Sequence, residues 1–245
     1  MRQVIILDTE TTGVTPEDEI LQLSIVNSRK EILLNEYYKP KKHNEWPGAQ
    51  QIHHISPLDV IDKPNILEQK DQIEKIINDS YIIVGYNLQF DIRMLKQSGI
   101  EISEDIRIID IMQPFAKVYG DYDPARKNYK WQKLETCAKY YGYQTEGYHN
   151  SLEDCLATLH CFKMMYFRNQ LDELHYQPIM GQNYWTLCFN STELFPGELQ
   201  WNGNQHDIKN KALGICYPTK ELCEQNLKAD FKKIAGKSYE EFKKQ

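Results

Sequence analysis

The chain has 245 residues, of which 41% are hydrophobic and 26% are charged, so it can bury one substantial core, and a disordered or fibrous protein is excluded. Its six cysteines include no Cys-x-x-Cys pair, which argues against a disulfide scaffold or a zinc site. The formal net charge of −6 argues against a protein that coats nucleic acid by bulk electrostatics, although a carboxylate metal site would itself add local negative charge.

The first apolar run, residues 4–7, ends at Asp8 and is too short for a signal peptide or a membrane span. We therefore expect a cytoplasmic location and no membrane partner. The same run predicts a buried strand that enters the polar loop 8–13. Residues 19–26 and 31–38 predict two more strands, joined as a hairpin.

Helical and strand patterns alternate in the middle of the chain. The predicted elements are a helix start at Ser56–Asp59, an amphipathic helix over 66–77, a strand over 81–85, a helix from Phe90 to near Gly99, a strand over 106–110, and helices over 134–141 and 151–167. This order predicts an α/β fold, with a mixed five-stranded sheet flanked by helices.

The residue pattern changes after Asn169, where glycines and prolines interrupt short apolar runs. We expect residues 1–168 to form the main domain and residues 169–245 a small C-terminal α+β appendage of unknown role. Its predicted elements are strands over 185–189 and 212–217 and a helix capped by Thr219 that runs to about Lys233. Trp185, Trp201 and Tyr217 are expected to form its small core in preference to the alternative, a binding surface.

Three carboxylates are predicted to meet at one edge of the sheet. Asp8 and Glu10 are two residues apart at a strand end, so their side chains share a face. Asp91 follows the strand 81–85, on the edge where sites of α/β sheets lie. Carboxylate oxygens are the ligands that Mg²⁺ and Mn²⁺ prefer. Taken singly, these acids also fit ordinary roles as turn caps, solvated side chains or first-turn helix residues.

A histidine and a fourth acid stand at the start of the last helix of the main domain. Asn150 or Ser151 can cap this helix, which places Asp154 in its first turns and His149 on the preceding loop. A loop histidine can exchange protons near neutral pH, as a general base must. A solitary loop histidine is also a common surface residue.

Three segments, 6–13, 84–91 and 148–154, resemble the exonuclease motifs of the DEDDh (DnaQ-like) family, which includes the proofreading epsilon subunit of bacterial DNA polymerase III. The resemblance covers residues 1–168 and implies an RNase H-like fold. His149 stands five residues before Asp154, as in the histidine subclass, whereas Asn150 occupies the position of the tyrosine variant.

The resemblance implies a metal-dependent 3′→5′ exonuclease that releases nucleoside 5′-monophosphates. It assigns two Mg²⁺ or Mn²⁺ ions to Asp8, Glu10, Asp91 and Asp154, with Asp8 as the bridge and His149 as the general base. The substrate-binding positions it implies are Thr11, Thr12, Gly13, Val14, His53, Asn87 and Phe90. For Phe90, a place in the core is an equal alternative to stacking on a base.

The expected substrates are single-stranded 3′ ends, DNA in preference to RNA, and the expected partner is a DNA polymerase or replication complex. An RNA-trimming exoribonuclease of the same family and a catalytically silent nucleic-acid-binding scaffold are the alternatives. The segment 119–131 interleaves aromatic and basic residues, which suits single-stranded nucleic acid, but a solvated loop with Trp131 anchored in the core is slightly favoured.

Overall fold

The computed structural model describes residues 3–144, 150–168, 170–171, 180–190, 193–213, 215–217, 220–235 and 239–242. The chain divides into two compact units, Met1–Met165 and Tyr166–Gln245. No helix within these described ranges combines the length and the apolarity needed to cross a lipid bilayer.

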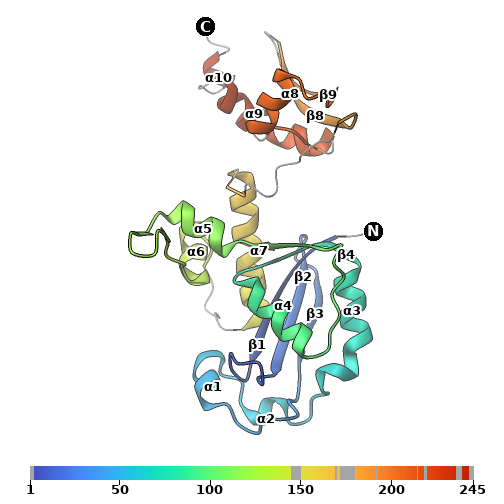
Figure 1. Ribbon diagram of the computed structural model, residues 1–245, viewed down its shortest axis with the longest axis vertical. Coiled ribbons are helices and arrows are strands. Elements are labelled where there is room, and N and C mark those ends of the chain that lie inside the picture. The colour runs from blue at the N-terminus through green and yellow to red at the C-terminus, as the bar shows by residue number, and fades with distance from the viewer. Residues whose placement is uncertain are drawn as a thin grey trace. The chain divides into compact units, whose positions relative to one another are not determined.

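The first unit is built on a five-stranded sheet with strand order β3-β2-β1-β4-β5 (Figure 1). The strands are β1 (Gln3–Thr11), β2 (Ile20–Asn27), β3 (Ile32–Tyr37), β4 (Ser80–Gly85) and β5 (Arg107–Asp110). β1 pairs antiparallel with β2 and parallel with β4, β2 pairs antiparallel with β3, and β4 pairs parallel with β5. The predicted mixed five-stranded α/β architecture is therefore confirmed.

Helices α3 (Lys70–Asn78) and α4 (Leu88–Gln97) cover one face of this sheet. Alternation along β1 directs Ile5 and Leu7 into the cluster that these helices share, with Ile73, Met94 and Leu95 fully buried in it. This core fixes the start of α4, which carries Asp91, against the sheet.

Helix α7 (Ser151–Phe167) lies on the other face of the sheet, where its first turn meets β2. The hydroxyls of Ser24 and Ser151, both fully buried, are 2.6 Å apart. Ser24 donates its one proton to Oδ1 of Asn35, so Ser151 is the donor in the serine pair. The backbone N–H of Ser151 also donates to Oε1 of Gln22 at 3.4 Å. This polar network sets where α7 begins.

The remaining helices of the first unit surround the sheet. They are α1 (Pro47–His53), α2 (Pro57–Val60), the 3₁₀ turn η1 (Ile66–Gln69), α5 (Met112–Tyr119) and α6 (Leu134–Tyr140), and a short hairpin of β6 (Tyr122–Asp123) and β7 (Asn128–Tyr129) joins α5 to α6. Ser56 begins α2 with a capping box, as predicted, but the helix ends after one turn. Residues 66–77 are divided between η1 and α3, and α1 and α5 were not predicted.

The second unit contains the antiparallel pair β8 (Asn183–Phe189) and β9 (Leu194–Gln200), with helices α8 (Gln205–Ala212), α9 (Lys220–Ala235) and α10 (Tyr239–Phe242). The prediction of a strand over 212–217 was wrong, because Ala212 ends α8 and Tyr217 makes only an isolated bridge to Trp185. The partner of β8 is β9, whose Pro196 is tolerated because each strand of a two-stranded sheet is an edge. Thr219 lies outside the described residues.

The core of the second unit differs from the expected one. Trp201 is buried beside Tyr184 and Cys216, and Tyr217 is buried as well, whereas Trp185 is only half-buried. The hydroxyl of Tyr184 donates to Asp207 at 2.8 Å, and that of Tyr217 donates to Asp230 at 2.7 Å. Two buried tyrosines of this unit, Tyr184 and Tyr217, are therefore hydrogen-bonded to carboxylates.

We expect Ser151→Ala to lower the free energy of unfolding by about 1–2 kcal/mol, because a buried hydroxyl donor is lost from the network that seats α7. The exposed Ser103→Ala variant should change it by less than about 0.5 kcal/mol. Urea unfolding followed by circular dichroism would measure both. Equal midpoints for the two variants would mean that the serine pair does not stabilise the fold.

Candidate active site

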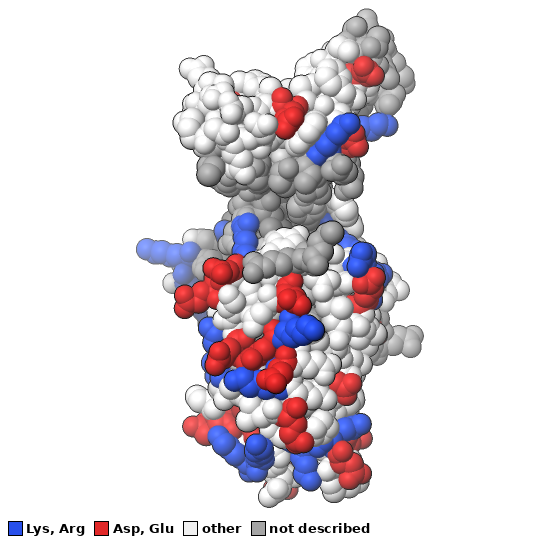
Figure 2. Space-filling model, turned by 90° about the vertical axis from the view of Figure 1, so that its right-hand side faces the viewer, with Lys and Arg blue, Asp and Glu red and all other residues white. Residues whose placement is uncertain are grey.

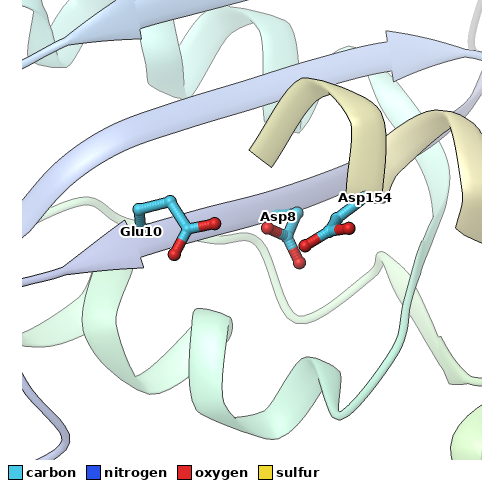
Figure 3. Close-up of side chains that lie close together, drawn as sticks. All are labelled: Asp8, Glu10 and Asp154. Atoms are coloured by element: carbon cyan, nitrogen blue, oxygen red, sulfur yellow. The ribbon is translucent and has the colours of Figure 1, made fainter. Parts of the chain in front are cut away.

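Two of the predicted ligands come from the central strand. Asp8 pairs with Ser24 and Glu10 pairs with Gln22 in the antiparallel register of β1 with β2. Because the two residues alternate with Thr9, both carboxylates leave the strand on the same side, as Figure 3 shows. Both side chains are half-buried.

The third carboxylate comes from the first turn of α7. Oδ1 of Asn150 accepts the backbone N–H of Leu152 at 3.2 Å and thus caps the helix, and the backbone N–H of Asp154 donates to the carbonyl of Asn150. The carboxylate oxygens of Asp8, Glu10 and Asp154 that could serve as ligands all lie within 4.8 Å of one another. Two elements far apart in sequence, β1 and α7, therefore bring three acids together (Figure 3).

Asp91 lies beside this group and is held by β1. It stands in the first turn of α4, after Asn87 in a left-handed conformation with φ 61°, and is 3% exposed. The backbone N–H and the hydroxyl of Thr9 both donate to its Oδ1, at 2.9 and 2.7 Å. No carboxylate oxygen of Asp91 lies within 4.8 Å of the ligand oxygens of all three residues in this group. Its negative charge nevertheless acts on Asp8.

Burial and mutual repulsion make these carboxyls weak acids. Burial raises the pKa of Asp8 well above its usual range, and the charges of Asp91, Asp154 and Glu10 raise it further. Burial, followed by the charges of Asp154 and Asp91, raises the pKa of Glu10 to about 8. Burial raises the pKa of Asp91 to about 7, although its hydrogen bonds from Thr9 oppose this shift.

The donor set fits hard divalent cations. All the converging atoms are carboxylate oxygens, the ligands that Mg²⁺ and Mn²⁺ prefer, and a divalent ion would relieve the repulsion that raises the pKa values of Asp8 and Glu10. The residues that would hold such ions are Asp8, Glu10 and Asp154, with Asp91 alongside.

The loop after β1 satisfies its own polar groups. The hydroxyl of Thr11 donates to the carbonyl of Gly13 at 2.6 Å, and the hydroxyl of Thr12 donates to Oδ1 of Asp18 at 2.8 Å. Both threonines are 7% exposed, so their hydroxyls are turned into the loop. A Cβ on Gly13 would approach the Asp18 carboxylate to 2.6 Å, so here the absence of a side chain makes room for Asp18.

Val14 and Phe90 both contact Arg93, a residue of α4. Val14 is 72% exposed, and its carbonyl accepts Nη2 of Arg93 at 3.0 Å. The Arg93 guanidinium lies 5.3 Å from the ring centroid of Phe90, which is half-buried and packs against the main core. One side of the Phe90 ring is therefore used in the core and another contacts Arg93, while Val14 presents its side chain to solvent.

His53 supports the end of β1. The backbone N–H of Ile55 donates to Nδ1 of His53 at 3.0 Å, so the ring proton of the neutral imidazole is on Nε2, which donates to the carbonyl of Thr11 at 3.1 Å. His53 is 7% exposed. In this structure its ring positions the backbone next to Glu10.

His149 lies outside the described residues. A residue that the sequence reading did not single out, Asp110, stands at the end of β5, and its Oδ1 accepts the backbone N–H groups of Asn87 and Met112, both at 3.0 Å. Its charge also raises the pKa of Asp91. The sequence did contain an indication that Asp110 lies near the site, since it ends a strand at the same edge of the sheet as the residues before Asp91.

The chain is similar in sequence to Uncharacterized exonuclease CP81 of Escherichia phage 186, which is 32% identical over 165 residues that cover 63% of this chain and 84% of the relative. RNA exonuclease 4 of Saccharomyces cerevisiae is 27% identical, with 70% and 56% covered. DNA polymerase III subunit epsilon of Rickettsia conorii is 31% identical, with 44% and 52% covered.

Similarity to solved structures extends over most of the chain. Exonuclease I of E. coli, solved in complex with a dA16 oligonucleotide, superimposes with a TM-score of 0.57 at 18% identity, over 77% of this chain and 48% of that one. The chain thus spans about half the length of exonuclease I, and the likeness establishes the fold.

The family model RNase_T, described as exonuclease, matches residues 5–162, a stretch that contains β1, α4 and the start of α7. Proteins of this family depend on divalent metal ions. Since this match covers more than half of the sequence, the chain belongs to the RNase_T family of exonucleases.

Proposed function

We propose that the chain is a metal-dependent 3′→5′ exonuclease that removes nucleoside 5′-monophosphates from single-stranded nucleic acid, with DNA preferred. The convergence of the Asp8, Glu10 and Asp154 oxygens within 4.8 Å, with Asp91 beside them, carries this proposal. Carboxylates brought this close together repel one another unless cations neutralise them, and phosphodiester hydrolysis is a reaction that such cations assist.

The four acids would bind metal ions, and the histidine would move a proton. Asp8, Glu10, Asp91 and Asp154 would hold two divalent ions, Mg²⁺ or Mn²⁺. Such ions lower the pKa of bound water and stabilise the charge that develops on the phosphate and on the leaving 3′ oxygen. His149, two residues before the start of α7 in the sequence, would accept the proton of the attacking water.

Binding of the terminal nucleotide is assigned to the segment that follows Glu10. Thr11, Thr12, Gly13 and Val14 would contact it, with the exposed Val14 side chain against the base and the loop's other groups setting its shape. Asn87, which is exposed, and Phe90 would lie near the next nucleotide. His53 would act by holding the Thr11 carbonyl in place.

The preference for DNA is supported by the likeness to the polymerase III epsilon subunit and to the DNA-bound exonuclease I. The likeness to a yeast RNA exonuclease supports RNA trimming as the second candidate. We assign the activity to residues 1–168, propose a cytoplasmic location, and propose a DNA polymerase or replication complex as partner.

The direct test is a gel assay with 5′-labelled single-stranded DNA and RNA of one sequence, in Mg²⁺, Mn²⁺ or EDTA. We expect a metal-dependent ladder that shortens from the 3′ end, with DNA degraded faster, and no ladder with Asp8→Asn, which keeps the side-chain volume but removes the negative charge. Absence of a ladder from the wild-type chain with either sugar would favour the silent scaffold.

The raised pKa values predict how stability without metal depends on pH. The pKa of Asp91 is raised to about 7 and that of Glu10 to about 8, so the folded protein holds protons that the unfolded chain releases near pH 4. This stabilisation is full below about pH 4 and is lost as the pH rises through these folded values.

In EDTA, we therefore expect the Tm to fall by more than about 4 °C between about pH 6 and pH 9, and Mn²⁺ to raise it more at pH 9 than at pH 6. Differential scanning fluorimetry measures both, and Asp8→Asn should flatten the profile because the Asp8 carboxyl, whose own pKa is raised, is gone. A metal-free Tm that stays constant or rises over this range would contradict the prediction.

His149→Ala should keep the Tm increase that Mn²⁺ produces but lose roughly 10²–10⁴-fold in turnover, as expected for a general base. The matched control is His54→Asn, at an exposed histidine with φ 61°, a conformation that asparagine tolerates. Wild-type turnover in His149→Ala would remove this residue from the mechanism.

A further inference from the structure

Two aromatic side chains outside the carboxylate site are exposed on the segment that joins α5 to α6. Trp131 is 63% exposed and Tyr122 is 49% exposed. The expectation that Trp131 is anchored in the core was therefore wrong. The segment extends away from the sheet (Figure 1), so water surrounds rings that would be more stable if covered.

The hairpin β6–β7 holds one of these rings in place. Tyr122 and Tyr129 are cross-strand partners, and their rings contact edge to face with centroids 5.3 Å apart. The turn between them is tight, with Lys127 at φ 50°. Tyr122 is thus presented with its ring orientation already set by Tyr129.

The segment that carries Trp131 is hydrogen-bonded to the chain beside the carboxylate site. The hydroxyl of Tyr86 donates to the carbonyl of Gln132, the residue after Trp131, at 2.8 Å. Tyr86 follows β4 directly and precedes Asn87, where the turn into α4 and Asp91 begins. The exposed tryptophan therefore stands on a segment bonded to the chain that delivers a catalytic carboxylate.

Charge on this segment favours a polyanion. Residues 119–133 carry four basic side chains, Arg126, Lys127, Lys130 and Lys133, and two acidic ones, in a chain whose net charge is −6. Lys130 pairs with Asp121 and Arg126 pairs with Asp123 at the surface, and ion pairs of this kind are weak and exchange readily for phosphate. Within the described parts of the chain, Lys127 and Lys133 form no ion pair.

A different face of the first unit has another distribution of charge. Figure 2 shows the side that lies to the right in Figure 1, where acidic and basic side chains alternate without a continuous basic track among the residues described. Exposed aromatic rings interleaved with cations, as on the segment 119–133, are the arrangement that stacks bases while neutralising phosphates.

We propose that Tyr122 and Trp131 form a stacking surface that binds the single strand upstream of its 3′ end, an inference that rests on the proposed exonuclease function. The shared chemistry is an unpaired base beside a phosphate, in DNA or RNA. The surface raises affinity for long strands and does not touch the reacting phosphate.

The test compares a long and a short substrate. Anisotropy titrations would use labelled single-stranded DNA and RNA of about 20 nucleotides, in Mg²⁺, with 3′-terminal phosphorothioate linkages that slow hydrolysis. Turnover of the p-nitrophenyl ester of thymidine 5′-monophosphate reports on the carboxylate site alone, because this ester has no upstream nucleotide.

We expect Tyr122→Ala and Trp131→Ala each to raise Kd for at least one oligonucleotide about fivefold or more, and Trp131→Phe to retain near wild-type Kd because a ring remains. The control Tyr81→Ala, at a tyrosine 45% exposed near the opposite end of β4, should leave Kd unchanged. Turnover of the nitrophenyl ester should equal that of the wild type in all four variants.

Unchanged Kd for both DNA and RNA in the two alanine variants would overturn the proposal, as would a wild-type chain that binds neither strand. A parallel loss of ester turnover would also overturn it, because the residues would then act through the fold of the site. Tighter binding by wild type than by the variants, with no cleavage of any substrate, would support this surface while refuting the exonuclease function.

Discussion

The first unit depends on how it accommodates electrostatic repulsion, because several carboxylates lie close together at one edge of its sheet. Asp8, Glu10 and Asp154 lie too close together to ionise freely, and burial removes the water that would screen them. Such a cluster persists only because β1, α4 and α7 are held by other interactions. The hydrophobic core fixes α4, and the Gln22, Asn35, Ser24 and Ser151 network fixes α7.

The surrounding polar contacts hold these carboxylates in place and adjust their acidity. Thr9 directs two donors at Asp91, which favours its charged form, and Asp110 opposes that effect from the neighbouring strand. Asp110 in turn ties Asn87 and Met112 together at the edge of the sheet. The same carboxylate therefore shapes the backbone before α4 and tunes the acidity of the residue that α4 carries.

Much of the first unit could be predicted because local signals agreed with the global fold. The alternation in β1, the capping residues before α7 and the acids at strand ends each indicated their element and their edge. The inward turn of the Thr11 and Thr12 hydroxyls could not be predicted, because it depends on Asp18 and on contacts across a loop. In the second unit, Pro196 was taken as a break although an edge strand tolerates it.

The loop after β1 has its polar groups engaged within the protein. The Thr12 hydroxyl bonds to Asp18, the Gly13 carbonyl to Thr11, and the Val14 carbonyl to Arg93, so the loop is shaped on folding rather than by a ligand. A nucleotide placed against it would cause little further loss of conformational entropy. If it binds here as we propose, the nucleotide would also meet a surface whose shape is already set and on which the Val14 side chain is exposed, and an apolar side chain cannot distinguish the four bases by hydrogen bonds.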